Sequence, residues 1–177
     1  MSIIIIIFAT VLSLFFPKSV EAYNIAGQSG ALRVVSEKNI DQRKDKLRSF
    51  LRAQNSPLAE HSDRFVEFAD KYGIDWKLLP AISGVESAFG KRIIASSFNA
   101  YGWGGGRIRF NSWEESIEKV SKALAEKYYA RGLNTPQKMN PVYCPPNKAW
   151  AGKVIGIMNK IENFKPSLSY SSIKLSI

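Results

Sequence analysis

The spacing of hydrophobic positions along the chain predicts a series of amphipathic helices joined by short polar segments. The first is a basic helix over residues 39–54, ended by Asn55-Ser56-Pro57. Its charged side is better explained as the solvated face of a packed helix than as a face lying on a membrane. A second helix is expected from Ser62, as its N-cap, to Gly73, which closes it.

The middle of the chain combines a short apolar helix with a long glycine-rich segment. The helix covers roughly residues 76–88, with Asp75 as its cap and Gly90 at its end. Pro80 is acceptable there only near the first turn. Residues 91–111 break the helical periodicity and contain four glycines between positions 102 and 106. This segment is predicted to be a loop or a short β-hairpin.

Further helices follow in the C-terminal third. Ser112 and Glu115 have capping-box spacing for a helix that reaches about Arg131. A short helical turn is expected at Thr135-Pro136, and a loop over residues 140–147. The last helix begins at about Lys148, and its apolar face is formed by Trp150, Val154, Ile157 and Ile161.

The fold class predicted from this order is mainly α (α+β), with one domain over residues 39–163 and a serine-rich, disordered tail over 164–177. The N-terminus differs in composition from both the domain and the tail. Residues 3–16 form an apolar run of signal-peptide length, and Val20 and Ala22 are residues that a signal peptidase favours.

A signal peptide over residues 1–22 and a linker over 23–38 are therefore expected. No Lys or Arg precedes the apolar run, so an uncleaved anchor with transient membrane contact stays open. Either alternative predicts a protein that is secreted or held at the outer face of the cytoplasmic membrane, in the cell wall or periplasm.

Charge and rare residues narrow the function classes. The 177-residue chain has 25 basic and 15 acidic residues, a net charge of +10 that attracts polyanions. Export counts against nucleic acid as the partner. The single Cys144 cannot form an intramolecular disulfide, and together with the single His61 it cannot supply the ligands of a zinc site. A packed thiol, no cofactor and a monomer are expected, and serine-protease chemistry is excluded for want of a nucleophile motif.

One carboxylate stands out on the helix over residues 76–88. At 100° per residue, Glu86 falls within about 20° of Leu79 and about 40° of Ile82, inside the apolar stripe. Burial and the negative end of the helix dipole both favour the protonated form, which a general acid requires. A buried ion pair with Lys91 or Arg92 is the alternative explanation.

The segment after this helix is rich in aromatic and amide side chains. Asn99, Tyr101 and Trp103 follow Glu86 closely. Aromatic rings stack on pyranose faces, and amides bond to hydroxyl and acetamido groups, so the cluster suggests a sugar-binding cleft. Ordinary hydrophobic packing is the alternative for each aromatic residue taken singly.

These residues carry a family resemblance. The stretch LLPAISGVESAFGKR…FNAYGWGG resembles the "ES-x-x-G" and "N-x-[FY]-G" pattern of the bacterial glucosaminidase family (mannosyl-glycoprotein endo-β-N-acetylglucosaminidase-like domain), within the lysozyme superfamily. The run VYCPPNKAWAGKVIGIM resembles that family's terminal tyrosine motif and closing helix. The resemblance covers about residues 57–162.

The resemblance implies a lysozyme-like helical domain and a substrate of peptidoglycan or a related amino-sugar glycan. Glu86 would be the general acid that protonates the glycosidic oxygen. Trp150 would pack the closing helix. The residues expected to support or line the substrate cleft are Ser87, Asn99, Tyr101, Gly102, Trp103 and Tyr143.

A partner carboxylate for Glu86 is missing from the expected place. Cleavage by two carboxylates needs a nucleophile or base opposite the acid, yet no Asp or Glu lies between Glu86 and Glu114. Glu114 and Glu115 stay open, although the capping box explains Glu115 better. Two mechanisms remain open: a hydrolase that recruits the substrate's acetamido group or a water held by Tyr143, and a lytic transglycosylase that leaves 1,6-anhydro ends. Two alternatives without catalysis also remain: a wall-binding module, and a protein that binds nucleic acid or anionic membrane through its charge alone.

Overall fold

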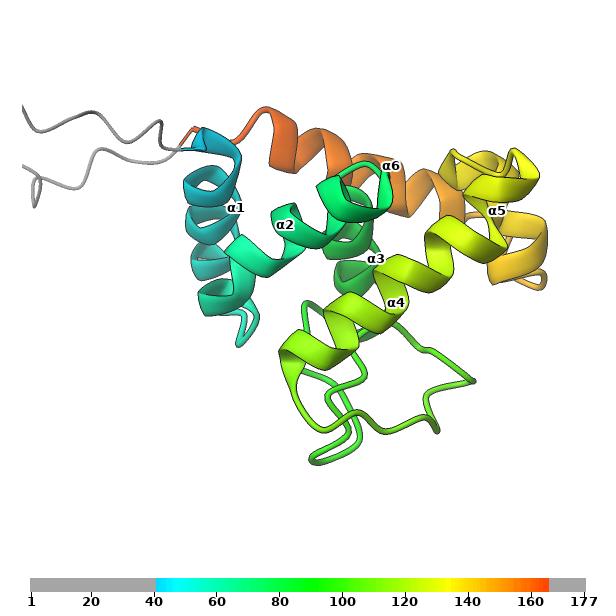
Figure 1. The fold of residues 1–177 in the computed structure, drawn as a ribbon, viewed down its shortest axis with the longest axis horizontal. Helices are drawn as coiled ribbons and strands as arrows, with labels where there is room; N and C mark the ends of the chain where they lie inside the picture. The colour runs from blue at the N-terminus through cyan, green and yellow to red at the C-terminus, as the bar shows by residue number, and fades with distance from the viewer. Residues whose placement is uncertain (1–40, 166–177) are drawn as a thin grey trace, which may run out of the picture. The chain divides into compact units, whose positions relative to one another are not determined.

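The computed structural model describes residues 41–165, which fall within one compact unit beginning at Asn39. The predicted signal peptide, the linker and nearly all of the predicted tail lie outside the described residues. The described part is mainly helical (Figure 1) and contains no strand, so residues 91–111 form a loop rather than a hairpin. The elements are α1 (Gln42–Ala53), η1 (Ala59–His61), α2 (Ser62–Tyr72), α3 (Leu78–Ser87), α4 (Trp113–Lys127), η2 (Tyr129–Arg131), α5 (Pro136–Tyr143) and α6 (Trp150–Glu162).

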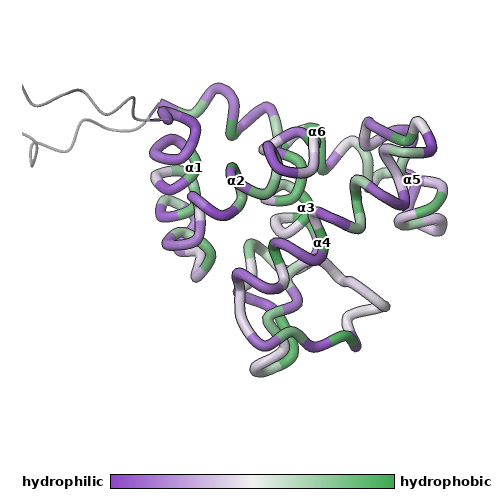
Figure 2. The backbone as a smooth tube through the Cα atoms, in the orientation of Figure 1, coloured by the Kyte–Doolittle hydropathy of each residue, from purple (hydrophilic) through white to green (hydrophobic). Residues whose placement is uncertain are grey.

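Helix α3 lies at the centre of the hydrophobic core. Every residue from Leu78 to Ser83 is buried, because α3 packs against α6 and also contacts α4. Helices α1, α2 and α4 bury one face only, and hydrophilic and hydrophobic positions alternate along them (Figure 2). Pro80 lies within the first turn of α3, where a proline costs no helical hydrogen bond.

The start of α2 differs from the prediction. Ser62 is not an N-cap, because the chain enters α2 from the short helix η1 and Ser62 already has helical backbone angles. Its Oγ is buried and has no hydrogen-bond partner among the described residues. The predicted end at Gly73 is confirmed.

The ends of α3 are set by neighbouring loop residues. Asp75 lies ahead of the helix, and its carboxylate accepts the N–H of Lys77 at 2.9 Å, so it caps the preceding turn. The helix ends at Ser87, before the predicted Gly90. Ala88 and Phe89 already adopt positive φ values of 51° and 62°, which turns the chain away from the helix axis.

The capping prediction for α4 is confirmed at Ser112, whose Oγ accepts the N–H of Glu115 at 3.1 Å. The carboxylate of Glu115 binds the N–H of Asn111 rather than that of Ser112. The predicted continuous helix to Arg131 is wrong in detail: α4 ends at Lys127 and the chain continues as η2.

The prediction of a loop over residues 140–147 is wrong at its start, because α5 continues through Pro141 to Tyr143. The carbonyl that Pro141 leaves without a helical partner belongs to the exposed Gln137. Asn140 stabilises the end of α5, since its amide donates to the carbonyls of Cys144 and Asn147, both at 3.0 Å.

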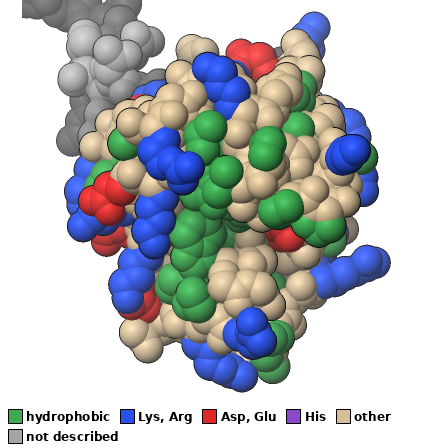
Figure 3. Space-filling model, turned by 90° about the vertical axis from the view of Figure 1, so that its right-hand side faces the viewer, with side chains coloured by type: hydrophobic (Ala, Val, Ile, Leu, Met, Phe, Trp, Pro, Cys, Tyr) green, Lys and Arg blue, Asp and Glu red, His purple; other side chains and the backbone are tan. Residues whose placement is uncertain are grey.

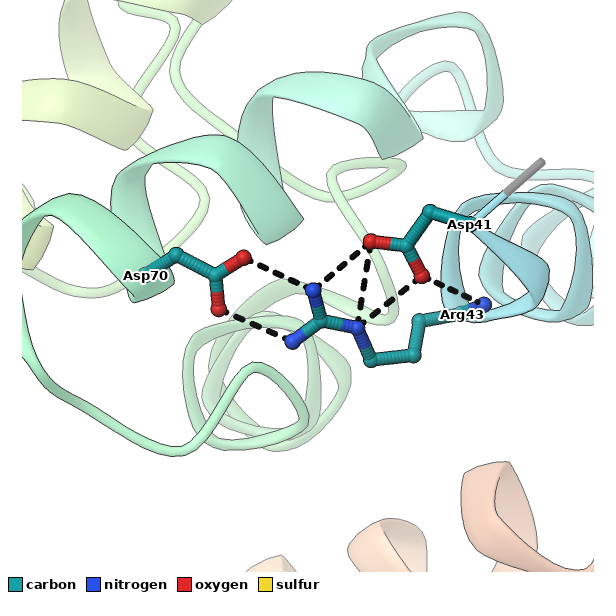
Figure 4. A network of polar contacts seen from close by, with 3 residues as sticks. All are labelled: Asp41, Arg43 and Asp70. Atoms are coloured by element: carbon teal, nitrogen blue, oxygen red, sulfur yellow. Dashed lines mark hydrogen bonds and ion pairs between the residues drawn. The ribbon is translucent and has the colours of Figure 1, made fainter. Parts of the chain in front are cut away.

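A network of ion pairs joins α1 to α2 (Figure 4). Asp41 caps α1 by accepting the N–H of Arg43 at 3.0 Å, and the guanidinium of Arg43 binds both this carboxylate and that of Asp70. The bonds to Asp70 are 2.8 and 2.7 Å long. Hydrogen bonding by Arg43 lowers the pKa of Asp41. The network is partly exposed, so it contributes modestly to stability.

Candidate active site

Glu86 lies in the last turn of α3, and its side chain is exposed. The predicted burial is therefore wrong, and neither predicted ion pair, with Lys91 or Arg92, is present among the described residues. Helical spacing placed Glu86 correctly on the side of Leu79 and Ile82. The element facing that last turn, however, is a loop that presents a glycine there, so the carboxylate is left open to solvent.

That glycine is Gly102, where a side chain would displace the carboxylate of Glu86. A Cβ atom on Gly102 would lie 2.8 Å from Oε2 of Glu86, and the backbone has a φ of +65°, which side-chain-bearing residues rarely adopt. The loop backbone can therefore approach the carboxylate closely without covering it.

The carboxylate is oriented from the opposite side by α6. The indole Nε1–H of Trp150 donates to Oε1 of Glu86 at 2.7 Å, and the Trp150 side chain is 1% exposed. Its ring stacks on that of Tyr143, with centroids 4.7 Å apart and an interplanar angle of 23°. Trp150 was predicted only to pack the closing helix; the structure shows that it also holds the carboxylate.

Aromatic rings continue from this pair into an open hollow of about 200 Å³. The Tyr143 ring lies 6.0 Å from Trp103 and 5.9 Å from Tyr128, measured between centroids. The lining residues are Gly102, Trp103, Gly104, Gly105, Tyr128 and Tyr143. On the face that includes α5, apolar side chains form a band flanked by Lys and Arg (Figure 3). The hollow therefore offers aromatic surfaces and glycine backbone next to Gly102, which lies against the carboxylate of Glu86.

Tyr143 joins the two walls of this hollow. Its hydroxyl donates to the carbonyl of Tyr101 at 2.7 Å, which ties the end of α5 to the loop. Burial, and to a smaller degree the charge of Glu86, raise the pKa of Tyr143 well above its ordinary value. The phenol therefore remains protonated at neutral pH and serves as a donor.

Asn99 shapes the loop from inside. Its Nδ2 donates to the carbonyls of Trp103 and Ile108, at 2.9 and 3.0 Å, and its Oδ1 accepts the N–H of Trp103 at 3.0 Å. The side chain is 5% exposed. All of its hydrogen-bonding capacity is directed at the backbone, so Asn99 positions Trp103 rather than binding a ligand.

Ser87 and Tyr101 also support the site from within the core. The Ser87 hydroxyl donates to the carbonyl of Ala100 at 2.8 Å and accepts the N–H of Gly90 at 2.9 Å, which fastens the loop to the end of α3. Tyr101 is fully buried, and burial raises its pKa. The nearby Ser116 hydroxyl makes this rise in pKa smaller. The Tyr101 hydroxyl itself forms no well-directed hydrogen bond among the described residues.

Of the residues predicted to bind substrate, Gly102, Trp103 and Tyr143 line the hollow, whereas the other three are buried supports. The sequence analysis missed the role of Tyr128, because its spacing fits the apolar side of the preceding helix equally well. It also missed the bond from Trp150 to Glu86, which depends on how α6 crosses α3.

Glu114 and Glu115 of α4, the two candidates for a second carboxylate, contact other side chains away from the hollow, as does Glu118 of the same helix. Glu114 contacts His61 at 2.8 Å, Glu115 binds Lys119, and Glu118 contacts Lys71 at 2.7 Å. None of them is among the residues that line the hollow.

No protein-family model matches the sequence, and no curated protein is significantly similar to it. Residues 41–165 include no helix with the length and apolar character needed to cross a bilayer. The same part of the chain holds no group of three His, Cys, Asp or Glu side chains arranged for a metal ion.

Proposed function

We propose that this protein cleaves a β-1,4 bond between amino sugars in peptidoglycan, as a glucosaminidase-like enzyme with a lysozyme-like helical fold and Glu86 as its general acid. The observation that carries the proposal is the bond from Trp150 to Glu86 beside an aromatic hollow. An accessible carboxylate, held in one orientation next to stacking surfaces, is what protonation of a glycosidic oxygen requires.

The proposed chemistry follows from the surroundings of Glu86. Sugar rings stack on Trp103 and Tyr143, and the glycine backbone lets the strand approach closely. Exposure leaves Oε2 within reach of the substrate. A strand lying over the hollow displaces water from the carboxyl group, and loss of water favours its uncharged, proton-donating form. Oε1 stays bonded to Trp150 throughout.

The product depends on what attacks the sugar after protonation. A hydrolase needs a water or the substrate's acetamido group, since the lining residues include no Asp or Glu. The same observation favours a second candidate, a lytic transglycosylase, in which the 6-hydroxyl of muramic acid attacks and leaves a 1,6-anhydro end. We propose secretion or attachment at the outer face of the cytoplasmic membrane, where such a substrate is found.

The test is mass spectrometry of fragments released from purified peptidoglycan by the chain from Tyr23 onward. Glu86→Gln keeps the size and the bond from Trp150 but has no acidic proton, so release is expected to fall by about 10²- to 10⁴-fold. Glu126→Gln, an exposed residue of α4, is the matched control and is expected to keep full activity.

The ends of the fragments identify the reaction. Anhydro ends indicate the transglycosylase, and reducing ends indicate a hydrolase. The sugar at the reducing end separates a glucosaminidase from a muramidase. Unchanged release by Glu86→Gln would refute the general-acid role, and binding without any release would favour a wall-binding module.

A further inference from the structure

Charged residues are unevenly distributed along the described part of the chain. Residues 87–113 contain four Lys or Arg and no Asp or Glu, and residues 127–161 contain six Lys or Arg and again no acidic residue. Every residue that lines the hollow comes from one of these two segments. Apart from Glu86, the acidic residues of the described part lie in residues 41–75 and 114–126 and at Glu162. The two segments that supply the walls of the hollow therefore contain basic residues and no acidic ones.

The basic residues of the 91–111 loop have no carboxylate partner within residues 41–165. Lys91 and Arg109 donate to the backbone carbonyls of Gln54 and Ala95. By contrast, the arginines of α1 and α2 pair with carboxylates; Arg64, for example, binds Glu67 at 2.6 Å. The arginines of α1 and α2 are therefore paired with carboxylates, whereas the basic residues of the 91–111 loop, which supplies one wall of the hollow, are not so paired among the described residues.

Arg107 lies at the edge of the hollow. A Cβ atom on Gly105, one of the lining residues, would be 3.9 Å from Nη2 of Arg107. The side chain is exposed, and no hydrogen bond or ion pair of its guanidinium is present in the described part of the chain. A planar guanidinium with all its donors free is suited to bind a carboxylate through two parallel hydrogen bonds.

We propose that the hollow accepts a polyanionic glycan strand and that Arg107 binds a carboxylate carried by that strand. This inference rests on the proposed function and specifies its substrate as an acidic amino-sugar polymer rather than a neutral, chitin-like one. An excess of basic residues in the two segments that form the hollow attracts a polyanion towards it. The concave, aromatic site beside Arg107 favours a glycan strand over an anionic lipid surface, which would need a protruding face.

Binding can be measured without cleavage in the Glu86→Gln background. The ligands are purified peptidoglycan sacculi, the same sacculi with their carboxylates amidated, and chitin. Arg107→Gln is compared with Arg52→Gln, which removes the same charge from an exposed arginine of α1. Circular dichroism checks that each variant is folded.

We expect Arg107→Gln to weaken binding to untreated sacculi by about two- to fivefold, the range for one exposed ion pair. The loss should vanish on amidated sacculi and on chitin, and Arg52→Gln should bind like its parent. Equal losses for the two variants, or the same loss on chitin, would overturn the proposal. So would tighter binding to phosphatidylglycerol vesicles than to sacculi. If Arg107-dependent binding is found but the wild-type chain releases no fragments, the proposed function fails and this inference stands.

Discussion

The indole N–H of Trp150 donates to Oε1 of Glu86 at 2.7 Å, joining residues that are 64 positions apart in the chain. This bond fixes one carboxylate oxygen and leaves the other facing Gly102. The geometry of the candidate site therefore depends on the packing of α6 against α3, although Glu86 itself is exposed.

Trp150→Phe is expected to lower the rate of glycan cleavage by about tenfold, because it removes one charge-assisted hydrogen bond while keeping an aromatic ring against Tyr143. The rate of fragment release from peptidoglycan measures this effect. The control is Trp113→Phe, a similar truncation of a half-buried tryptophan that is not part of the hollow. An equal loss of rate in this variant would contradict the role of Trp150 in positioning Glu86.

Gly102→Ala is expected to displace Glu86 and reduce activity by more than tenfold, because the added Cβ would lie 2.8 Å from Oε2. The backbone strain at positive φ should also cost about 1 kcal/mol of unfolding free energy. Gly132→Ala has a similar φ of +74° and no atom within 4 Å of the new Cβ. We expect the two variants to lose the same unfolding free energy, measured by denaturation. Only Gly102→Ala should lose activity, measured by fragment release.

Asn99→Asp is expected to destabilise the loop and abolish cleavage, because a carboxylate cannot donate to the carbonyls of Trp103 and Ile108. Loss of these two partly buried hydrogen bonds should cost about 2 to 4 kcal/mol. Denaturation and tryptophan fluorescence measure this change. A variant with wild-type stability and reduced binding would instead mean that Asn99 contacts the glycan.

Tyr101→Phe is expected to stabilise the protein by about 1 kcal/mol, because it removes a buried hydroxyl without a hydrogen-bond partner. Burial raises the pKa of Tyr101, so the unfolded chain ionises at lower pH than the folded one. The associated stability is present below pH about 10 and is lost as the pH rises further. The melting temperature of the variant should fall less steeply above pH 10; a parallel fall would contradict this.

Asp41→Asn is expected to cost less than about 1 kcal/mol at neutral pH, since asparagine still caps α1 and only a partly exposed ion pair is lost. Arg43 lowers the pKa of Asp41, so its contribution is present at neutral pH and disappears as the pH falls through that lowered value. The two proteins should therefore differ at pH 7 and converge in acid, as thermal melts can show.

The sequence predicted the helices well where a local signal sets their ends. Ser112 caps α4 because its hydroxyl needs only the N–H three residues later, and Gly73 ends α2 by its own backbone conformation. Ser62 and Pro141 were misinterpreted, because the short helix before one and the side-chain bonds of Asn140 near the other override their local preferences.

The sequence alone determined part of the candidate site: one carboxylate at the end of an apolar helix, followed by a loop with Trp103 and, later, Tyr143. The tertiary structure alone decided their roles. Whether Glu86 is buried depends on the side chain that faces it, and Gly102 provides none. Whether the amide of Asn99 or the phenol of Tyr143 is free to bind a ligand depends on the backbone groups around it. The periodicity of a sequence carries no information about such contacts between distant segments.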